Sequence, residues 1–316
     1  MIQTYLEKIK NAIYGKDVRQ AIHDAIHQCY EDGKAGELDL IAREQVAQLS
    51  NPNLLINSDF RRPVNQRGKT NYESSITTWS SIYTVDRWFI QHGNTVTVNP
   101  NSLTLTNVST EGTGTFVQRF ENALPVGDYT VSVNVLEIAG TGYVGLSYQN
   151  GEDDVLKLEE GLNILTVKNK VPTRVQVTCT IGCSVELAYI KFEHGTIATP
   201  FVPRLYGEEL ALCQRYYMQL PYNHVAYAGS DGNLYLCFDT RVLNMREKPS
   251  FIGANKITLV FEGGIYEYTI ASVNTDNLID KGYVKVDYTY SNKVGYAHKS
   301  MVAYFNIKSY LDAEIY

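Results

Sequence analysis

The sequence predicts a mainly β protein with few helices. Apolar and polar side chains alternate through much of residues 51–204, for example along 129–135 and 175–181. Helical periodicity is confined to residues 1–50 and to a short stretch at 209–217. At 316 residues, the chain exceeds what one hydrophobic core usually organises. We expect a short N-terminal helical segment, a central antiparallel jelly-roll β-sandwich, a short linking helix and a C-terminal small β-sandwich domain.

The N-terminal segment carries two apolar stripes at helical spacing. The first stripe lies between Gly15 and Gly33, and the second precedes the break at Asn51-Pro52. A lone helix of roughly 13 residues is marginal in water. The stripes are therefore expected to be buried in an oligomer or against another protein of the same assembly. Their residues are Val18, Ile22 and Ile26 in the first, and Leu38, Ala42, Val46 and Leu49 in the second.

The linking helix is predicted over residues 209–217, with the sequence ELALCQRYY. Leu210, Cys213 and Tyr217 recur at i, i+3 and i+7, which indicates one short amphipathic helix. Acidic residues lie in the first turn and Arg215 in the last, as the helix dipole prefers. We expect this helix to join the jelly roll to the terminal domain.

Strand-like runs continue through residues 218–316. The pair Gly263-Gly264 between two of these runs is a hairpin signal. This pattern predicts a second β domain after the helix. The clearest runs are 233–239, 256–261, 266–271, 283–290 and 301–307.

Composition excludes several classes of function. The net charge is −6 and the pI about 5.6, so the chain has no excess of basic residues that would favour nucleic acid. No window approaches eighteen consecutive apolar residues, which predicts no membrane insertion and no secretory leader. Five cysteines, an odd number spread along the chain, fit reduced thiols better than a disulfide framework.

Several separate phrases resemble bacteriophage tail-fibre and baseplate receptor-binding proteins that contain a carbohydrate-binding-module-like jelly roll. The phrases occur in the order expected for that family and cover nearly the full length. They are the segment 9–33, NLLINSDFRRPVNQRG at 53–68, TVDRW at 84–88, KFEHGTIATPF at 191–201, ELALCQRYY at 209–217, MREKP at 245–249 and DAEI at 312–315.

The resemblance implies three parts with different roles. Residues 1–50 would attach and oligomerise the protein, 51–204 would form a carbohydrate-binding-like jelly roll, and 205–316 would hold the linking helix and a receptor-binding β domain. It also implies a homotrimer in the virion tail, assembled in the host cytoplasm, with other tail or baseplate proteins and a bacterial surface polysaccharide as partners. A non-enzymatic host-attachment role follows. Two alternatives stay open: a structural tail connector and a wall polysaccharide depolymerase.

Tyrosine is the compositional outlier, with 24 residues against 10 Phe and 2 Trp. A tyrosine ring can lie against the C–H face of a sugar while neighbouring polar groups bind its hydroxyls. The alternative is that these tyrosines alternate into the interior of a sheet. The acidic net charge favours a neutral polysaccharide. The candidate saccharide-binding residues are Tyr222, Asn223, His224, Tyr227, Asp231, Asn233 and Tyr235.

Three motifs resemble metal sites, and no metal or other cofactor is assigned to the first two. His23 and His27 have the i, i+4 spacing of a zinc helix but lack the glutamate and a third ligand. Cys179 and Cys183 fall on one face of a strand, which favours buried thiols. The acidic run of Glu152, Asp153 and Asp154 could hold a structural calcium ion, or it could be a solvated hairpin tip.

No Ser-His-Asp order, nucleophile elbow, P-loop or dinucleotide-binding fingerprint is present. A pair of glycosidase carboxylates could still exist, because such a pair needs only a separation of roughly 5–10 Å, which sequence does not show. The chain has no solenoid-length repeat.

Overall fold

The computed structural model divides the chain into two compact units. One comprises Met1–Pro52 with Ile197–Val202, and the other comprises Asn53–Thr196 with Pro203–Tyr316. The second unit contains two large hydrophobic cores and a small cluster of Tyr83, Phe89 and Val117. The three domain limits drawn from the sequence stay a prediction. The structure describes residues 15–34, 50–75, 81–221, 223–228, 233–237, 245–261, 264–276, 283–289, 300–306 and 308–314.

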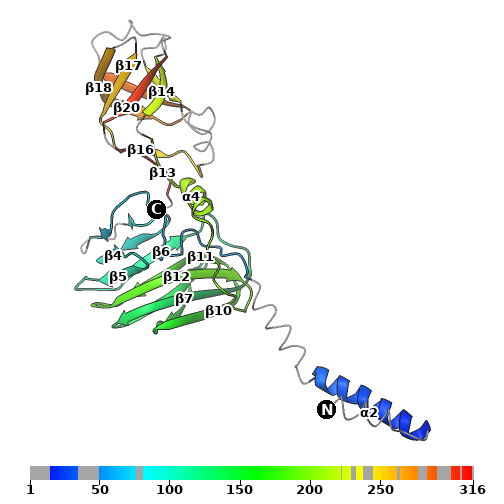
Figure 1. Ribbon diagram of the computed structural model, residues 1–316. Coiled ribbons are helices and arrows are strands. Elements are labelled where there is room, and N and C mark those ends of the chain that lie inside the picture. Colours follow the sequence, from blue (N-terminus) through cyan, green and yellow to red (C-terminus); the bar gives the residue numbers. More distant parts are fainter. Residues whose placement is uncertain are drawn as a thin grey trace. The chain divides into compact units, whose positions relative to one another are not determined.

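In the N-terminal unit, the helix α2 spans Gly15–Lys34 (Figure 1). Its predicted apolar stripe is largely solvent-accessible in the single chain, because Ile22 is 44% and Ile26 65% exposed, while Val18 is half-buried. No described helix has the length and hydropathy needed to cross a bilayer. The second predicted stripe, Leu38, Ala42, Val46 and Leu49, lies outside the described residues.

The central region is a sandwich of two antiparallel sheets, each with six described strands (Figure 1). The order in the first sheet is β1-β4-β5-β12-β7-β10, and in the second β2-β3-β6-β11-β8-β9. This confirms the predicted jelly-roll β-sandwich. The first sheet comprises β1 Asn71–Glu73, β4 Asn94–Val98, β5 Leu103–Asn107, β7 Gly127–Ala139, β10 Gly161–Lys170 and β12 Ser184–His194. The second comprises β2 Ile82–Tyr83, β3 Phe89–Gln91, β6 Gly114–Arg119, β8 Gly142–Tyr148, β9 Asp153–Lys157 and β11 Pro172–Cys179.

The core between the sheets contains a cluster of aromatic rings. Trp88 stacks on Phe116 with ring centroids 4.7 Å apart, and Phe60 meets Trp88 edge-on at 5.4 Å. The indole N–H of Trp88 donates to the carbonyl of Asn57 at 2.8 Å, which satisfies its only polar group. The phrases at 53–68 and 84–88 therefore meet in the core, where burial of their large side chains stabilises the sandwich.

The linking helix α4 spans Tyr206–Gln214, so it begins and ends three residues before the predicted limits. Cys213 is buried as predicted and Leu210 is half-buried, but Tyr217 belongs to strand β13 rather than to the helical stripe. The helix is followed by a turn, in which the Tyr216 N–H donates to the Cys213 carbonyl at 3.0 Å and the Arg215 carbonyl accepts from the Arg246 N–H at 2.7 Å.

The C-terminal strands form a closed barrel, whereas the sequence predicted a small sandwich. Closure follows because β20 pairs with both β14 and β17, which leaves no free edge. A three-stranded sheet, β13-β21-β16, accompanies the barrel. The barrel strands are β14 Asn223–Ala228, β15 Leu234–Cys237, β17 Lys256–Phe261, β18 Gly264–Asn274, β19 Tyr283–Thr289 and β20 Ser300–Phe305, and the small sheet has β13 Tyr217–Gln219, β16 Ser250–Ile252 and β21 Tyr310–Asp312.

Candidate functional site

A row of four polar side chains crosses one end of the second sheet of the sandwich. Arg119 on β6 lies opposite Arg174 on β11, which lies opposite Ser147 on β8, which in turn lies opposite Asp153 on β9. The row spans three strand spacings, or roughly 14 Å. It lies on the outer face because the next residue along β11, Val175, faces the core.

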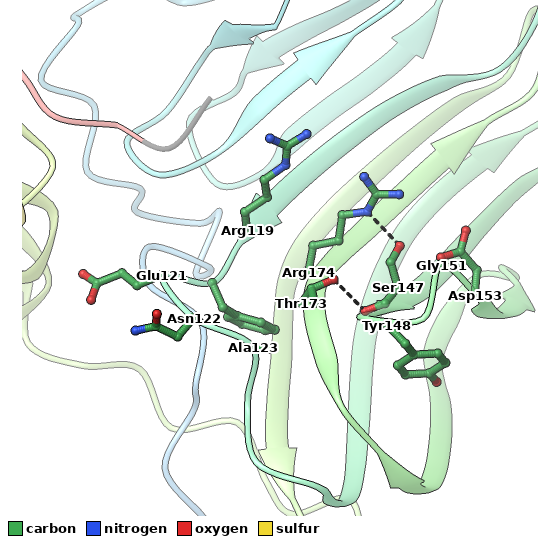
Figure 2. A pocket seen from close by; sticks show the side chains of 11 residues that line it. Arg119, Glu121, Asn122, Ala123, Ser147, Tyr148, Gly151, Asp153, Thr173 and Arg174 are labelled. Atoms are coloured by element: carbon green, nitrogen blue, oxygen red, sulfur yellow. Dashed lines mark hydrogen bonds between the residues drawn. The ribbon is translucent and has the colours of Figure 1, made fainter.

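The row borders an open hollow of about 430 Å³ (Figure 2). Residues 120–123, which follow β6, form its other side. In Figure 2 the guanidinium groups of Arg119 and Arg174 extend to the same side of the strands. The hollow thus combines two cations, two carboxylates and an amide in one place. Its lining residues are Arg119, Phe120, Glu121, Asn122, Ala123, Ser147, Tyr148, Gly151, Asp153, Thr173 and Arg174.

Local contacts hold the two arginines in place without neutralising them. Arg174 Nε donates to Ser147 Oγ at 2.7 Å, and the guanidinium of Arg119 lies 5.2 Å from the ring centroid of Phe89. Across the described residues, neither arginine forms an ion pair with a carboxylate. Their remaining N–H groups are available to a ligand in the hollow.

The acidic side chain of Glu121, which lines the hollow, is engaged elsewhere. Glu121 accepts hydrogen bonds from the Tyr216 hydroxyl at 2.5 Å and from Arg215 Nη2 at 3.1 Å. Figure 2 shows its carboxylate directed away from both guanidinium groups of the row. The side chain of Asp153, at the far end of the row, makes no hydrogen bond to any described residue. The hollow is therefore positive at the Arg119 end and negative at the Asp153 end.

The acidic run beside the hollow has its own cation. Lys170 Nζ lies 3.5 Å from Glu152 Oε2 and 3.8 Å from Asp154 Oδ2, and Asp154 accepts a 2.6 Å hydrogen bond from the Tyr148 hydroxyl. Burial and the neighbouring Asp154 raise the pKa of Tyr148. Over the described part of the chain, no group of three His, Cys, Asp or Glu side chains could hold a metal ion. The calcium prediction thus finds no support in the loop's geometry.

A second candidate surface lies on the outer face of the barrel. The rings of Tyr227 on β14 and Tyr235 on β15 stack with centroids 4.8 Å apart and planes 10° apart. Tyr283 on β19 meets Tyr235 edge-on at 5.3 Å. We call these three rings the tyrosine face. Tyr227 is 39% exposed, so part of its side chain is accessible to a ligand.

No family model and no curated protein sequence matches this chain. Similar solved structures include the carbohydrate-binding module CBM1 of BiXyn10A, at 12% identity and a TM-score of 0.29, covering 40% of this chain and 96% of that one. A family 29 carbohydrate-binding module gives 12% and 0.30, covering 40% and 99%. A putative sugar-binding protein from Bacteroides thetaiotaomicron gives 14% and 0.29, covering 46% and 100%. Values this low assign no family to the chain.

The residues predicted to bind saccharide fall in different places. Tyr227 lies on the exposed outer face of the barrel, where it meets the half-buried Tyr235, and Asn233 is half-buried just before β15. Asn223 belongs to β14, but its side chain is not described, and Tyr222 and Asp231 lie outside the described residues.

His224 was predicted to bind saccharide, and its burial corrects this. Its side chain is 6% exposed and packs edge-on against Phe305 with ring centroids 5.1 Å apart. Burial lowers the pKa of His224 to about 4. The reason is strand alternation, which turns His224 inward between its neighbours along β14.

The other two motifs that resemble metal sites lie on the helix α2 and in the sandwich core. The rings of His23 and His27 lie on α2 with centroids 6.2 Å apart, and His23 Nδ1 is 3.3 Å from Asp24 Oδ1. Cys179 and Cys183 are both buried in the sandwich core.

Sequence reasoning missed Arg119 and Arg174. The alternation that predicts Val175 and Val177 as inward residues also turns Arg174 outward, so part of the signal was present. The pairing of β6 with β11 was not readable, because register depends on strands 55 residues apart in the chain.

Proposed function

We propose that this protein attaches non-catalytically to a bacterial cell-surface saccharide as part of a phage tail. The observation that carries the saccharide part is the polar row from Arg119 to Asp153 along an open hollow of about 430 Å³. A sugar offers many hydroxyls in fixed directions, so its recognition needs donors and acceptors spread over a shallow surface. The row supplies both kinds of group over roughly 14 Å.

The attachment role rests on the phrases that resemble tail-fibre and baseplate receptor-binding proteins. In this proposal, α2 and the following segment assemble a homotrimer and dock onto other tail proteins. The exposure of Ile22 and Ile26 in the single chain supports that role, since an apolar stripe favours burial against a neighbour. Three tethered sites would raise avidity by roughly two orders of magnitude or more. A weak single site is therefore sufficient.

A depolymerase is the second candidate, and one observation bears on it. Glu137 on β7 and Glu186 on β12 lie opposite each other in the first sheet, beside a hollow of about 160 Å³. Opposed carboxylates are a requirement for glycoside hydrolysis. However, Glu137 is exposed, whereas a general acid needs an enclosed environment. We therefore favour non-catalytic binding over hydrolysis as the function.

The test is direct binding of the full-length protein to purified bacterial wall and capsular polysaccharides and to whole cells. A bulky Ala123→Trp substitution at the rim should fill the hollow and weaken binding, whereas Val126→Trp, on the exposed surface nearby, should not. Failure to bind any wall material or cell would favour the connector role. Release of soluble oligosaccharide, abolished by Glu186→Gln, would instead favour the depolymerase.

A further inference from the structure

We infer that the hollow binds the anionic group of an acidic saccharide between Arg119 and Arg174. This inference rests on the proposed saccharide binding and names the class of ligand. The group would be a carboxylate of a uronic acid or a phosphate of a polyol-phosphate polymer. Both present oxygens that two guanidinium groups can bind together.

The first argument is the cost of the arginine pair itself. Arg119 and Arg174 are direct cross-strand partners in the β6–β11 ladder. Residues placed directly opposite have Cβ atoms about 4.5–5.5 Å apart, and like charges in this position destabilise a sheet. Over the described residues, no carboxylate pairs with either guanidinium. An anion between them would turn this repulsion into two attractive contacts.

The second argument is the pre-organisation of the pair. Arg174 is tethered through Nε to Ser147 Oγ at 2.7 Å, which leaves both of its Nη groups for a ligand. The Arg119 guanidinium lies over the ring of Phe89, whose face attracts the cation. Two fixed guanidinium groups lose little conformational entropy when an anion binds.

The third argument is the position of the acidic side chains around the hollow. Glu121 is held by Tyr216 and Arg215, and Asp154 by the Tyr148 hydroxyl, so neither competes for the arginines. Asp153 stands two strands from Arg174, where it can accept from the hydroxyls of the same saccharide. The net charge of −6 predicted a neutral ligand, but this local pair of cations reverses the preference within the hollow.

The experiment compares the full-length protein on matched polymers. The probes are polygalacturonate, the same polymer after carboxyl reduction, and a glycerol-phosphate polymer. We expect binding to polygalacturonate, to the phosphate polymer or to both, with loss on carboxyl reduction. Arg119→Gln and Arg174→Gln should each weaken binding about tenfold or more. Arg62→Gln, an exposed arginine away from the hollow, makes the same change in net charge and should have no effect.

A measurement without saccharide tests the anion site by itself, with sulfate as the probe. Sulfate stabilises proteins in general, so the readout is the difference between variants. The Tm of each protein is measured in sodium sulfate and in sodium chloride at equal ionic strength. The increase in Tm with sulfate should be larger for the wild type than for the Arg119→Gln/Arg174→Gln double variant.

Each outcome decides between the two proposals. Equal binding of the native and carboxyl-reduced polymers, with the same affinity in the arginine variants, overturns the anion site and leaves saccharide binding standing. A selective effect of sulfate without binding to any polysaccharide supports the anion site and removes the saccharide role. Equal sulfate effects together with no polysaccharide binding remove both.

Discussion

Arg87 and Glu314, which are 227 residues apart in the sequence, form a buried ion pair. Arg87 Nη1 lies 2.9 Å from Glu314 Oε2, and the two side chains are 2% and 0% exposed. Arg67 lies 3.5 Å from the same carboxylate and 3.1 Å from Asp86. Arg87 also holds a φ of +72°, a region that non-glycine residues seldom occupy. These four side chains link the sandwich to the end of the chain.

Truncating this ion cluster should destabilise the protein strongly. Glu314→Ala leaves Arg87 and part of the charge of Arg67 buried without a partner, which costs about 3–5 kcal/mol. The measurement is the free energy of unfolding from urea denaturation. Glu111→Ala removes an exposed carboxylate that forms no hydrogen bond or ion pair with a described residue and serves as the control. Equal stability of the two variants would contradict the structural role of the pair.

Asp86 should make stability fall as pH rises. Burial raises the pKa of Asp86 to about 7, although Arg67 and Gln66 oppose the shift. Between pH 4 and 7 the folded state then holds a proton that the unfolded chain has released, so stability decreases with increasing pH.

Asp86→Asn mimics the protonated carboxyl and isolates this effect. Relative to the variant, the wild type should lose up to about 4 kcal/mol between pH 4 and pH 8. Denaturation followed by tryptophan fluorescence is suitable because Trp88 is close in the chain. A difference between wild type and variant that is constant with pH would show that the carboxylate stays charged in the folded state.

His224 should have the opposite pH dependence in the barrel. Its folded pKa is lowered to about 4, whereas the unfolded value is 6.5, so only the unfolded chain gains a proton between these limits. Stability contributed by the neutral side chain is present above pH 6.5 and is lost as pH falls toward 4, by about 3 kcal/mol at most. In His224→Leu this loss should be absent. Amide hydrogen exchange in β14 and β20 at pH 7.5 and 4.5 measures it locally.

The tyrosine face provides a separate test of where the ligand binds. If the barrel contributes to attachment, Tyr227→Ala should lower cell binding by removing an exposed ring worth about 1 kcal/mol or more. Tyr206→Ala, an exposed tyrosine on α4, is the matched control. Cell binding retained in Tyr227→Ala but lost in Arg174→Gln would assign attachment to the sandwich alone.

The exposed apolar stripe of α2 predicts which side chains hold an oligomer together. Charged substitutions in Ile22→Asp/Ile26→Asp should dissociate an oligomer that buries these side chains, because a buried unpaired charge is costly. Light scattering at micromolar concentration gives the mass, and circular dichroism checks that the β domains remain folded. A wild-type monomer under these conditions would refute the homotrimer.

Parts of the candidate sites were readable from the sequence. The tyrosine-rich segment 222–235 was identified as a candidate binding surface. One of its candidate residues was wrong, because alternation along β14 turns His224 inward and leaves Tyr227 outside. The helix α4 was placed within three residues, since its acidic first turn and apolar residues are local signals. Closure of the barrel was not foreseen, because it depends on β20 pairing with two distant strands.

By itself, the sequence determined the mainly β class, the sandwich and the linking helix. These features follow from periodicity, turn residues and the acidic first turn of the helix, which act over a few positions along the chain. Tertiary structure alone decided that Arg119 faces Arg174, that Arg87 meets Glu314 and that the last strands close into a barrel. The reason is that strand register and buried ion pairs join residues far apart in sequence, and packing of the whole core selects among the possible pairings.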